Sequence, residues 1–188
     1  MGRELAQAAM ALDCSERTLR RYFNEGVVRG ERSDGRGKVR ISPDEERYLR
    51  RHWAVLSRLR RALRTEPGVR LAVLFGSTAV GDDRSGSDVD LLVDHVSGDP
   101  IDVARLQRRL RERVGREVHV VLLEEAEESP ALLADVLTEG RVLVNRGDAW
   151  DRLTGRREEV LRAAAVEARD RREAARRAVD EARERLGA

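Results

Sequence analysis

The chain of 188 residues is long enough for one ordinary domain or two small ones, and too short for a large multidomain protein. Charged residues make up 38% of it, and no apolar run approaches the roughly 18 residues that would span a bilayer. The sequence opens with charged residues in place of a secretory leader and has one cysteine, Cys14. We therefore expect a cytoplasmic protein with no membrane span and no internal disulfide.

The first third of the chain predicts short helices around a turn, a hairpin and one long helix. Ser15 is a suitable N-cap for the second helix, and Gly26 is a suitable residue to end it. Ser42 would cap the long helix, with Pro43 and Glu45 at positions that favour a helix start. In chain order these elements are a helix near 5–12, a helix over 16–24, a glycine-broken basic hairpin around 29–41 and a helix from 43 to about 65.

From Val69 onward, short apolar runs alternate with helical patterns, which predicts strands covered on both faces. In order, the elements are strands at 71–75 and 89–93, a helix over 99–114, a strand over 118–123, a short helix over 130–137 and a strand over 141–144. The tail from Asp151 to Leu186 is rich in arginine and glutamate and should be largely helical. Its thin apolar stripe fits a solvated helix lying on the body and an antiparallel coiled-coil partner equally well.

The stretch from Gly76 to Asp90 holds the side chains that point to chemistry. Asp88 and Asp90 are two residues apart at the start of an apolar strand, so both carboxylates face the same side of the sheet. Two like charges this close are unfavourable unless a cation lies between them, which predicts a Mg²⁺ site. Gly76 and Ser77 end the preceding strand where a helix begins, and backbone N–H groups there can hold phosphate oxygens together with the serine hydroxyl. Transfer of a nucleoside monophosphate requires both features side by side.

At these positions the sequence resembles the minimal nucleotidyltransferases of the DNA polymerase β superfamily. Their pattern is Gly-Ser, a spacer, Ser and then Asp-x-Asp before apolar residues, and this chain fills it without insertion. The resemblance covers about 69–146 and implies an α/β (α+β) nucleotidyltransferase fold with a mixed sheet. It also implies a nucleotide-binding role for Gly76, Ser77 and Ser87, a catalytic and metal-binding role for Asp88 and Asp90, Mg²⁺ or Mn²⁺ as the cation, and ATP or another nucleoside triphosphate as the substrate.

The sequence departs from the family pattern at the third carboxylate, which comes from a later strand. His119 stands where that aspartate is expected, and Glu117, two residues earlier on the same strand face, is the nearby replacement carboxylate. Imidazole is a poor ligand for Mg²⁺, but it can act as a base or bind a softer divalent ion. The alternative for His119 is a half-buried strand histidine without a catalytic part. Thr78 and Val80 also stand where arginine often occurs in the family, which predicts weaker binding of the triphosphate.

The front of the chain carries an excess of basic residues. Residues 1–70 hold 17 basic and 10 acidic side chains, whereas residues 71–150 hold 9 and 16, and a basic surface favours binding to a phosphate backbone. Residues 3–64 resemble the winged helix-turn-helix of the MerR family, through the Ser-x-x-Thr-Leu-Arg-x-Tyr segment at 15–22 and the basic wing. The resemblance implies DNA contacts from Arg17, Thr18, Arg20, Arg21 and Tyr22 of the second helix and from Arg36, Lys38 and Arg40 of the wing. The alternative is a helical module that binds proteins.

The sequence therefore predicts three parts and leaves two hypotheses for the function. A winged helix-turn-helix over 1–66 precedes a nucleotidyltransferase domain over 67–147 and a helical tail over 148–188. In the first hypothesis, a DNA-binding nucleotidyltransferase moves AMP from ATP to a protein or small-molecule hydroxyl. Relatives of such domains are antitoxins that modify a partner toxin, and the front part would let a homodimer repress its own promoter. In the second hypothesis, a catalytically weak or inactive regulator keeps the fold to sense nucleotide or to bind a partner protein.

Overall fold

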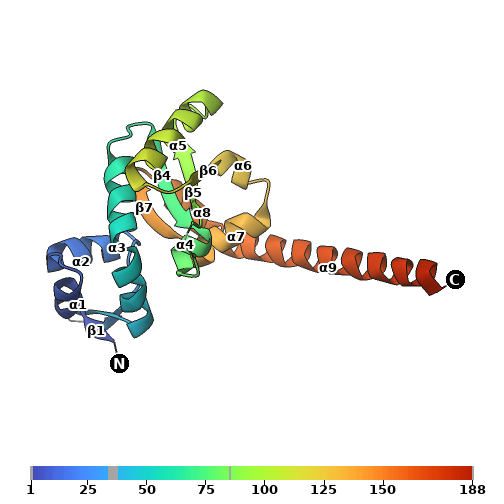
Figure 1. Ribbon diagram of the computed structural model, residues 1–188, viewed down its shortest axis with the longest axis horizontal. Helices are drawn as coiled ribbons and strands as arrows, with labels where there is room; N and C mark the ends of the chain where they lie inside the picture. The colour runs from blue at the N-terminus through green and yellow to red at the C-terminus, as the bar shows by residue number, and fades with distance from the viewer. Residues whose placement is uncertain (1, 34–37, 85, 188) are drawn as a thin grey trace.

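The computed structural model describes residues 2–33, 38–84 and 86–187. The front of the chain forms two short helices joined by a turn, a small three-stranded sheet and a long helix (Figure 1). In chain order its elements are β1 (Arg3–Glu4), α1 (Leu5–Ala11), α2 (Glu16–Asn24), β2 (Glu31–Ser33), β3 (Lys38–Ile41) and α3 (Pro43–Arg64). The predicted helices are confirmed here, and the sequence does not predict the short β1.

Local sequence signals set the ends of the front helices. The Ser15 Oγ accepts the backbone N–H three residues later at 3.1 Å, and Gly26 follows the end of α2 with a φ of +80°. Ser42 caps α3 in the same way, by accepting the Glu45 N–H at 3.0 Å. The Glu45 side chain does not close a capping box, because it is buried against Arg141 from a distant strand.

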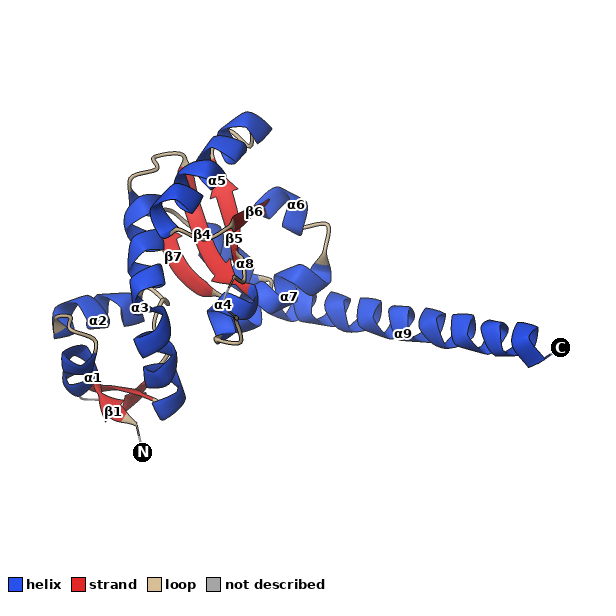
Figure 2. Cartoon of the chain, viewed as in Figure 1, coloured by secondary structure: helices blue, strands red, loops and turns tan. Residues whose placement is uncertain are grey.

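The rest of the chain forms a four-stranded sheet with helices on both faces (Figure 2). Its elements are β4 (Val69–Phe75), α4 (Gly76–Val80), β5 (Val89–His95), α5 (Pro100–Val114), β6 (Val118–Leu122), α6 (Leu123–Ala126), α7 (Pro130–Glu139), β7 (Arg141–Asn145), α8 (Ala149–Gly155) and α9 (Arg157–Gly187). The strand order is β6-β5-β4-β7, with β5 and β6 parallel and the other neighbours antiparallel. The predicted α/β fold with a mixed sheet is confirmed.

The sheet is buried on both faces, as the continuous apolar runs of β4 and β5 predict. Ala72 and Leu74 pack into a core with α3 and α5, whereas Leu71 and Val73 pack into a second core with α7 and α8. The first core continues without a break into the front of the chain. Helix α3 therefore buries side chains against both parts of the protein.

Helix α9 packs on α7 near its N-terminal end, where Val160 is buried, and then leaves the body (Figure 1). At a rise of 1.5 Å per residue, its 31 residues span about 46 Å. The described side chains beyond residue 168 are all exposed. The tail is helical and solvated as predicted, but most of it projects from the body and does not lie on it. Among the helices of the described ranges, none has the length and apolar composition that a membrane crossing needs.

Candidate active site

Two carboxylates of the acidic motif face a histidine from the neighbouring strand. Asp90 lies in β5, and the parallel register pairs it with His119 of β6. The His119 ring lies 3.7 Å from an Asp88 carboxylate oxygen through Nε2, and 3.7 Å from an Asp90 oxygen through Nδ1. All three side chains are between 30% and 57% exposed, so a substrate can reach them. The structure thus brings together three of the predicted site residues.

The electrostatics of this group favour a cation. Burial raises the pKa of Asp90; the charge of Asp88 raises it further, and His119 opposes both effects. Two hard oxygen donors on one face of the sheet fit a divalent cation, because such an ion would relieve the repulsion between them. Within the described part of the chain, no three or more His, Cys, Asp or Glu side chains are assembled as a metal site. The donor set that fits a cation here is therefore the Asp88–Asp90 pair.

The Gly–Ser turn packs directly against this pair. Gly76 has a φ of +69°, and a Cβ at this position would lie 2.6 Å from Asp90 Oδ2, so only glycine fits without displacing the carboxylate. Ser77 follows in the first turn of α4 and is partly exposed. The buried Thr78 hydroxyl donates to the Asp88 carbonyl oxygen at 3.1 Å. The turn and the acidic strand therefore form one packed unit.

Two other predicted residues are engaged elsewhere. The Ser87 Oγ accepts the Arg84 backbone N–H at 2.9 Å and so closes the loop before Asp88. Glu117 lies just before β6, is exposed, and has an oxygen 3.3 Å from Arg111 of α5. His119 therefore faces the acidic pair, while the contact that the structure gives Glu117 is with an arginine.

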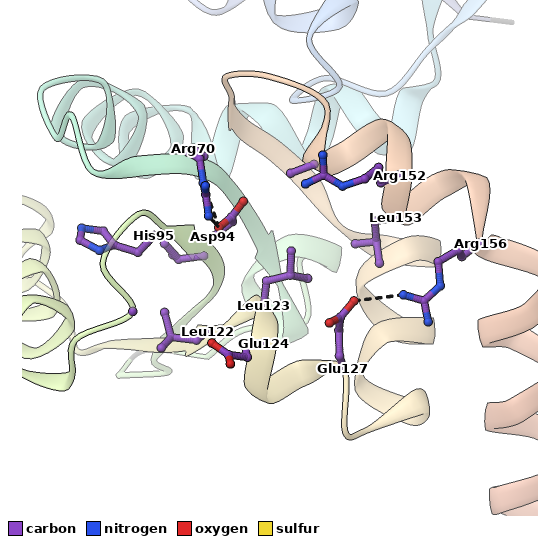
Figure 3. A pocket seen from close by; sticks show the side chains of 13 residues that line it. Arg70, Asp94, His95, Leu122, Leu123, Glu124, Glu127, Arg152, Leu153 and Arg156 are labelled. Atoms are coloured by element: carbon purple, nitrogen blue, oxygen red, sulfur yellow. Dashed lines mark hydrogen bonds and ion pairs between the residues drawn. The ribbon is translucent and has the colours of Figure 1, made fainter.

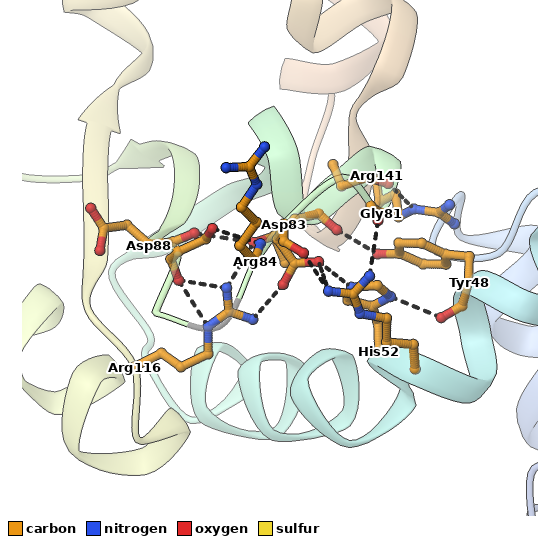
Figure 4. Close-up of polar contacts among 12 residues, drawn as sticks. Tyr48, His52, Gly81, Asp83, Arg84, Asp88, Arg116 and Arg141 are labelled. Atoms are coloured by element: carbon orange, nitrogen blue, oxygen red, sulfur yellow. Dashed lines mark hydrogen bonds and ion pairs between the residues drawn. The ribbon is translucent and has the colours of Figure 1, made fainter.

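A buried polar network below the motif connects it to α3 (Figure 4). Asp83 accepts from His52 at 2.7 Å and lies 3.1 Å from Arg116, and the Asp83 and His52 side chains are at most 6% exposed. Charged side chains are rarely buried unless they are paired. The sequence does not predict this network, because charged residues make up 38% of the chain and nothing local marks those that the fold will bury.

A separate cavity of about 370 Å³ lies at the other end of β5 from Asp88 (Figure 3). Asp94 and His95 line it together with residues from the end of β6 and from α8. Its charged side chains largely neutralise one another, since Arg70 lies 2.6 Å from Asp94 and Arg156 lies 3.0 Å from Glu127. The cavity is therefore distinct from the acidic motif.

The basic residues predicted to contact DNA are partly available at the surface. The side chains of Arg17 and Arg21 on α2, and of Lys38 and Arg40 on β3, are exposed, with Lys38 at 3.1 Å from Glu4. Arg20 is half-buried and pairs with Glu16, and the half-buried Thr18 shares a hydrogen bond with Ser15. Arg36 lies outside the described residues.

The prediction that Tyr22 projects toward DNA is wrong. Tyr22 is 7% exposed, and its ring lies 5.1 Å from that of Trp53, centroid to centroid. The Arg60 guanidinium sits 4.2 Å from the centre of the same ring. The reason is that Tyr22 lies with Leu19 on the buried face of α2, where its ring packs on Trp53 of α3, so the exposed face of α2 is the one that remains available.

The mixed sheet, the Gly–Ser turn and the paired carboxylates define a nucleotidyltransferase-type domain. Residues 57–149 match the family model described as Polymerase beta, Nucleotidyltransferase. This part of the chain is therefore a nucleotidyltransferase domain of that family, as the sequence motif predicts. The match begins inside α3 and ends at the start of α8.

Solved structures of toxin–antitoxin complexes contain chains with the same fold. A chain in the crystal structure of a toxin–antitoxin with AMP-PNP is 23% identical, with a TM-score of 0.53 over 64% of this chain and 97% of that one. A chain in the complex of a tri-AMPylated Shewanella oneidensis HEPN toxin with MNT antitoxin is 21% identical, with a TM-score of 0.50 over 66% of this chain and 98% of that one. Among curated proteins, no sequence matches this chain.

Proposed function

We propose that this protein is an antitoxin that transfers AMP from ATP to a hydroxyl group of a partner toxin. The observation that carries the proposal is the group of Asp88, Asp90 and His119 beside the Gly76–Ser77 turn. The solved complexes add support, because one contains AMP-PNP and another holds a tri-AMPylated HEPN toxin with its MNT antitoxin.

Each residue of the group has a distinct role in this proposal. Asp88 and Asp90 would hold Mg²⁺ or Mn²⁺, which supplies charge neutralisation to the triphosphate when bound. Gly76 and Ser77 would bind phosphate oxygens through the turn that begins α4. His119, whose ring lies 3.7 Å from an oxygen of each carboxylate, would accept the proton of the attacking hydroxyl at one ring nitrogen.

The proposal is tested by following two labels of ATP onto a candidate toxin. The full chain is incubated with Mg²⁺ or Mn²⁺, with a small helical toxin encoded beside it, and with ATP labelled at the α- or the γ-phosphate. We expect the α-label on the toxin and no γ-label, since AMP transfer releases the other two phosphates as pyrophosphate. Failure of the α-label to appear on that toxin with either cation contradicts the proposal.

Substitutions of His119 separate catalysis from a regulatory function. If His119 is the base, His119→Ala should lower the transfer rate by about 10²- to 10⁴-fold, with ATP binding retained. A non-catalytic nucleotide sensor is the second candidate, and the observation that favours it is the imidazole at the position where the family has a carboxylate. In that case the wild type binds ATP without transfer, and His119→Asp gains activity. Transfer rates and calorimetric ATP titrations of the three proteins distinguish these outcomes.

We also propose that residues 1–66 bind DNA as a winged helix-turn-helix of MerR type, in a homodimer that represses its own promoter. Exposed Arg17 and Arg21 on α2, with Arg40 on β3, support this proposal. Each phosphate contact contributes about −0.9 to the slope of log affinity against log salt. Replacing Arg17 and Arg21 with alanine should therefore make the slope shallower by about two for each protomer that contacts DNA.

The measurement is a titration of promoter DNA at several salt concentrations. A variant with Arg105→Ala and Arg108→Ala on α5 is the matched control, because it removes the same charge from exposed positions of another helix. It should keep the wild-type slope. An affinity of the wild type that is flat with salt would exclude this mode of DNA binding.

A further inference from the structure

The polar network that reaches the acidic motif begins on α3, outside the residues that match the family model (Figure 4). His52 is 2% exposed, with Nε2 at 2.7 Å from Asp83 Oδ1 and Nδ1 at 2.9 Å from the Tyr48 carbonyl oxygen. One ring nitrogen is thus fixed by its own helix, and the other holds a carboxylate from the loop after α4. His52 therefore sets the position of Asp83 relative to α3.

Asp83 in turn contacts an arginine, Arg116, near the start of β6. Its second oxygen, Oδ2, lies 3.1 Å from Arg116 Nη1. Burial acts to raise the pKa of Asp83, but the hydrogen bond and charge of His52 and the charges of Arg116 and Arg51 outweigh it, so the pKa is lowered. Asp83 is thus a buried carboxylate held between α3 and the segment that leads into β6, and its contacts leave Arg116 little freedom to move.

Arg116 joins the two halves of the nucleotidyltransferase motif. Its Nε donates to the Ser87 carbonyl oxygen at 3.0 Å, and its Nη2 donates to the Thr78 hydroxyl at 3.2 Å. The same hydroxyl donates to the Asp88 carbonyl oxygen. One guanidinium therefore connects the turn that would bind triphosphate to the loop end that carries Asp88.

Helix α3 holds the loop after the Gly–Ser turn at further points. The Tyr48 hydroxyl donates to the Thr78 carbonyl oxygen at 3.1 Å, and burial raises the pKa of Tyr48 to about 12, so this hydroxyl keeps its proton. Arg51 donates to the carbonyl oxygens of Gly81 and Asp83. Helix α4 and the residues Gly81 and Asp83 that follow it are thus fixed to α3 through both backbone and side-chain contacts.

We propose that Arg116, Asp83 and His52 are positioning residues of the nucleotidyl-transfer site. They set the distance between the Gly76–Ser77 turn and Asp88, and so the alignment of the triphosphate with the cation. This inference rests on the proposed transferase function. A displacement of about 1 Å at a reacting centre can lower a rate by about 100-fold, so a network that fixes this spacing has a measurable kinetic effect.

Paired substitutions of His52 test the proposal. Glutamine places an amide donor near the position of Nε2, whereas leucine has a similar size and no donor. We expect His52→Leu and Asp83→Asn to lower kcat for AMP transfer by about tenfold or more, with a smaller change in KM for ATP. His52→Gln should recover most of the rate. Arg113→Ala, at an exposed arginine of α5, is the control and should keep the wild-type rate.

A second readout, Mn²⁺ binding followed by electron paramagnetic resonance, separates this proposal from the proposed function. His52→Leu should weaken Mn²⁺ binding, and His52→Gln should not, with both proteins measured well below their unfolding temperatures. Wild-type protein that binds Mn²⁺ without transferring AMP contradicts the proposed transferase function and does not contradict the positioning role. Variants within twofold of the wild type in both rate and Mn²⁺ affinity overturn the positioning role, as does a wild type that shows neither activity nor Mn²⁺ binding.

Discussion

Replacing Asp88 and Asp90 together with asparagine is expected to lower AMP transfer by about a thousandfold or more. Cation binding contributes several kcal/mol of charge stabilisation in the transition state, and each 1.4 kcal/mol changes a rate about tenfold. Asparagine keeps the size of both side chains and removes the two negative charges that would hold the cation. The rate is measured with α-labelled ATP under the conditions used for the wild type.

The same double variant should be at least as resistant to heat as the wild type. Burial and the neighbouring Asp88 already raise the pKa of Asp90, which means that the charged pair is unfavourable in the folded protein without a cation. Lost activity together with an unchanged or higher Tm identifies residues kept for chemistry. Asp82→Asn, at an exposed aspartate of the same loop, is the control and should retain activity. Equal labelling by the wild type and the double variant would remove the basis of the proposed mechanism.

Arg141→Met is expected to lower the free energy of unfolding by about 3–5 kcal/mol, because it leaves a buried carboxylate without its partner. Arg141 is 1% exposed, and its guanidinium lies 2.7 and 2.8 Å from the two oxygens of Glu45 on α3. It also donates to the carbonyl oxygens of Val27 and Ala79 and lies over the Tyr48 ring. One side chain of β7 therefore joins the front of the chain, α3 and α4.

Urea denaturation measures this effect, and two variants serve as references. Adding Glu45→Met to Arg141→Met removes both charges and should recover part of the lost stability, since a buried ion pair can often be replaced by apolar residues. Arg105→Ala breaks an exposed pair with Asp102 and should cost less than about 1 kcal/mol. A cost below 1 kcal/mol for Arg141→Met would show that the Glu45 pair does not hold the front of the chain in place.

The parts of the fold that the sequence predicts well depend on short-range physics. Ser15 and Ser42 cap their helices through N–H groups three residues away, so the sequence alone locates both helix starts. The apolar runs of β4 and β5 predict burial on both faces, because successive side chains of a strand point to opposite faces of the sheet. Asp88 and Asp90 face one side of a strand because of its period of two. Local sequence does not predict that His119 lies beside them, since the β5–β6 register joins residues about thirty positions apart, and the prediction depends on the family pattern.

The features that the sequence does not predict depend on long-range contacts. Tyr22 carries an aromatic ring that suits either a DNA contact or a core, and only the packing of α2 on α3 decides for the core. Glu117 and His119 would share a strand face, but β6 begins at Val118, and Glu117 pairs with Arg111. No local sequence feature distinguishes Arg141 and His52 from the exposed charged residues around them.

The position of α3 in the one core that the front of the chain shares with the sheet has a consequence for cooperativity. The hydrophobic cluster that includes Leu19 and Ile41 at the front continues through Leu56 to Leu74 of the sheet. Calorimetry should therefore record one transition for residues 2–147 and no separate melting of the front, as for a single two-state unit. Cleavage by a protease near residue 66 would expose apolar surface on both fragments. The parts of the chain on the two sides of this position are therefore expected to denature together.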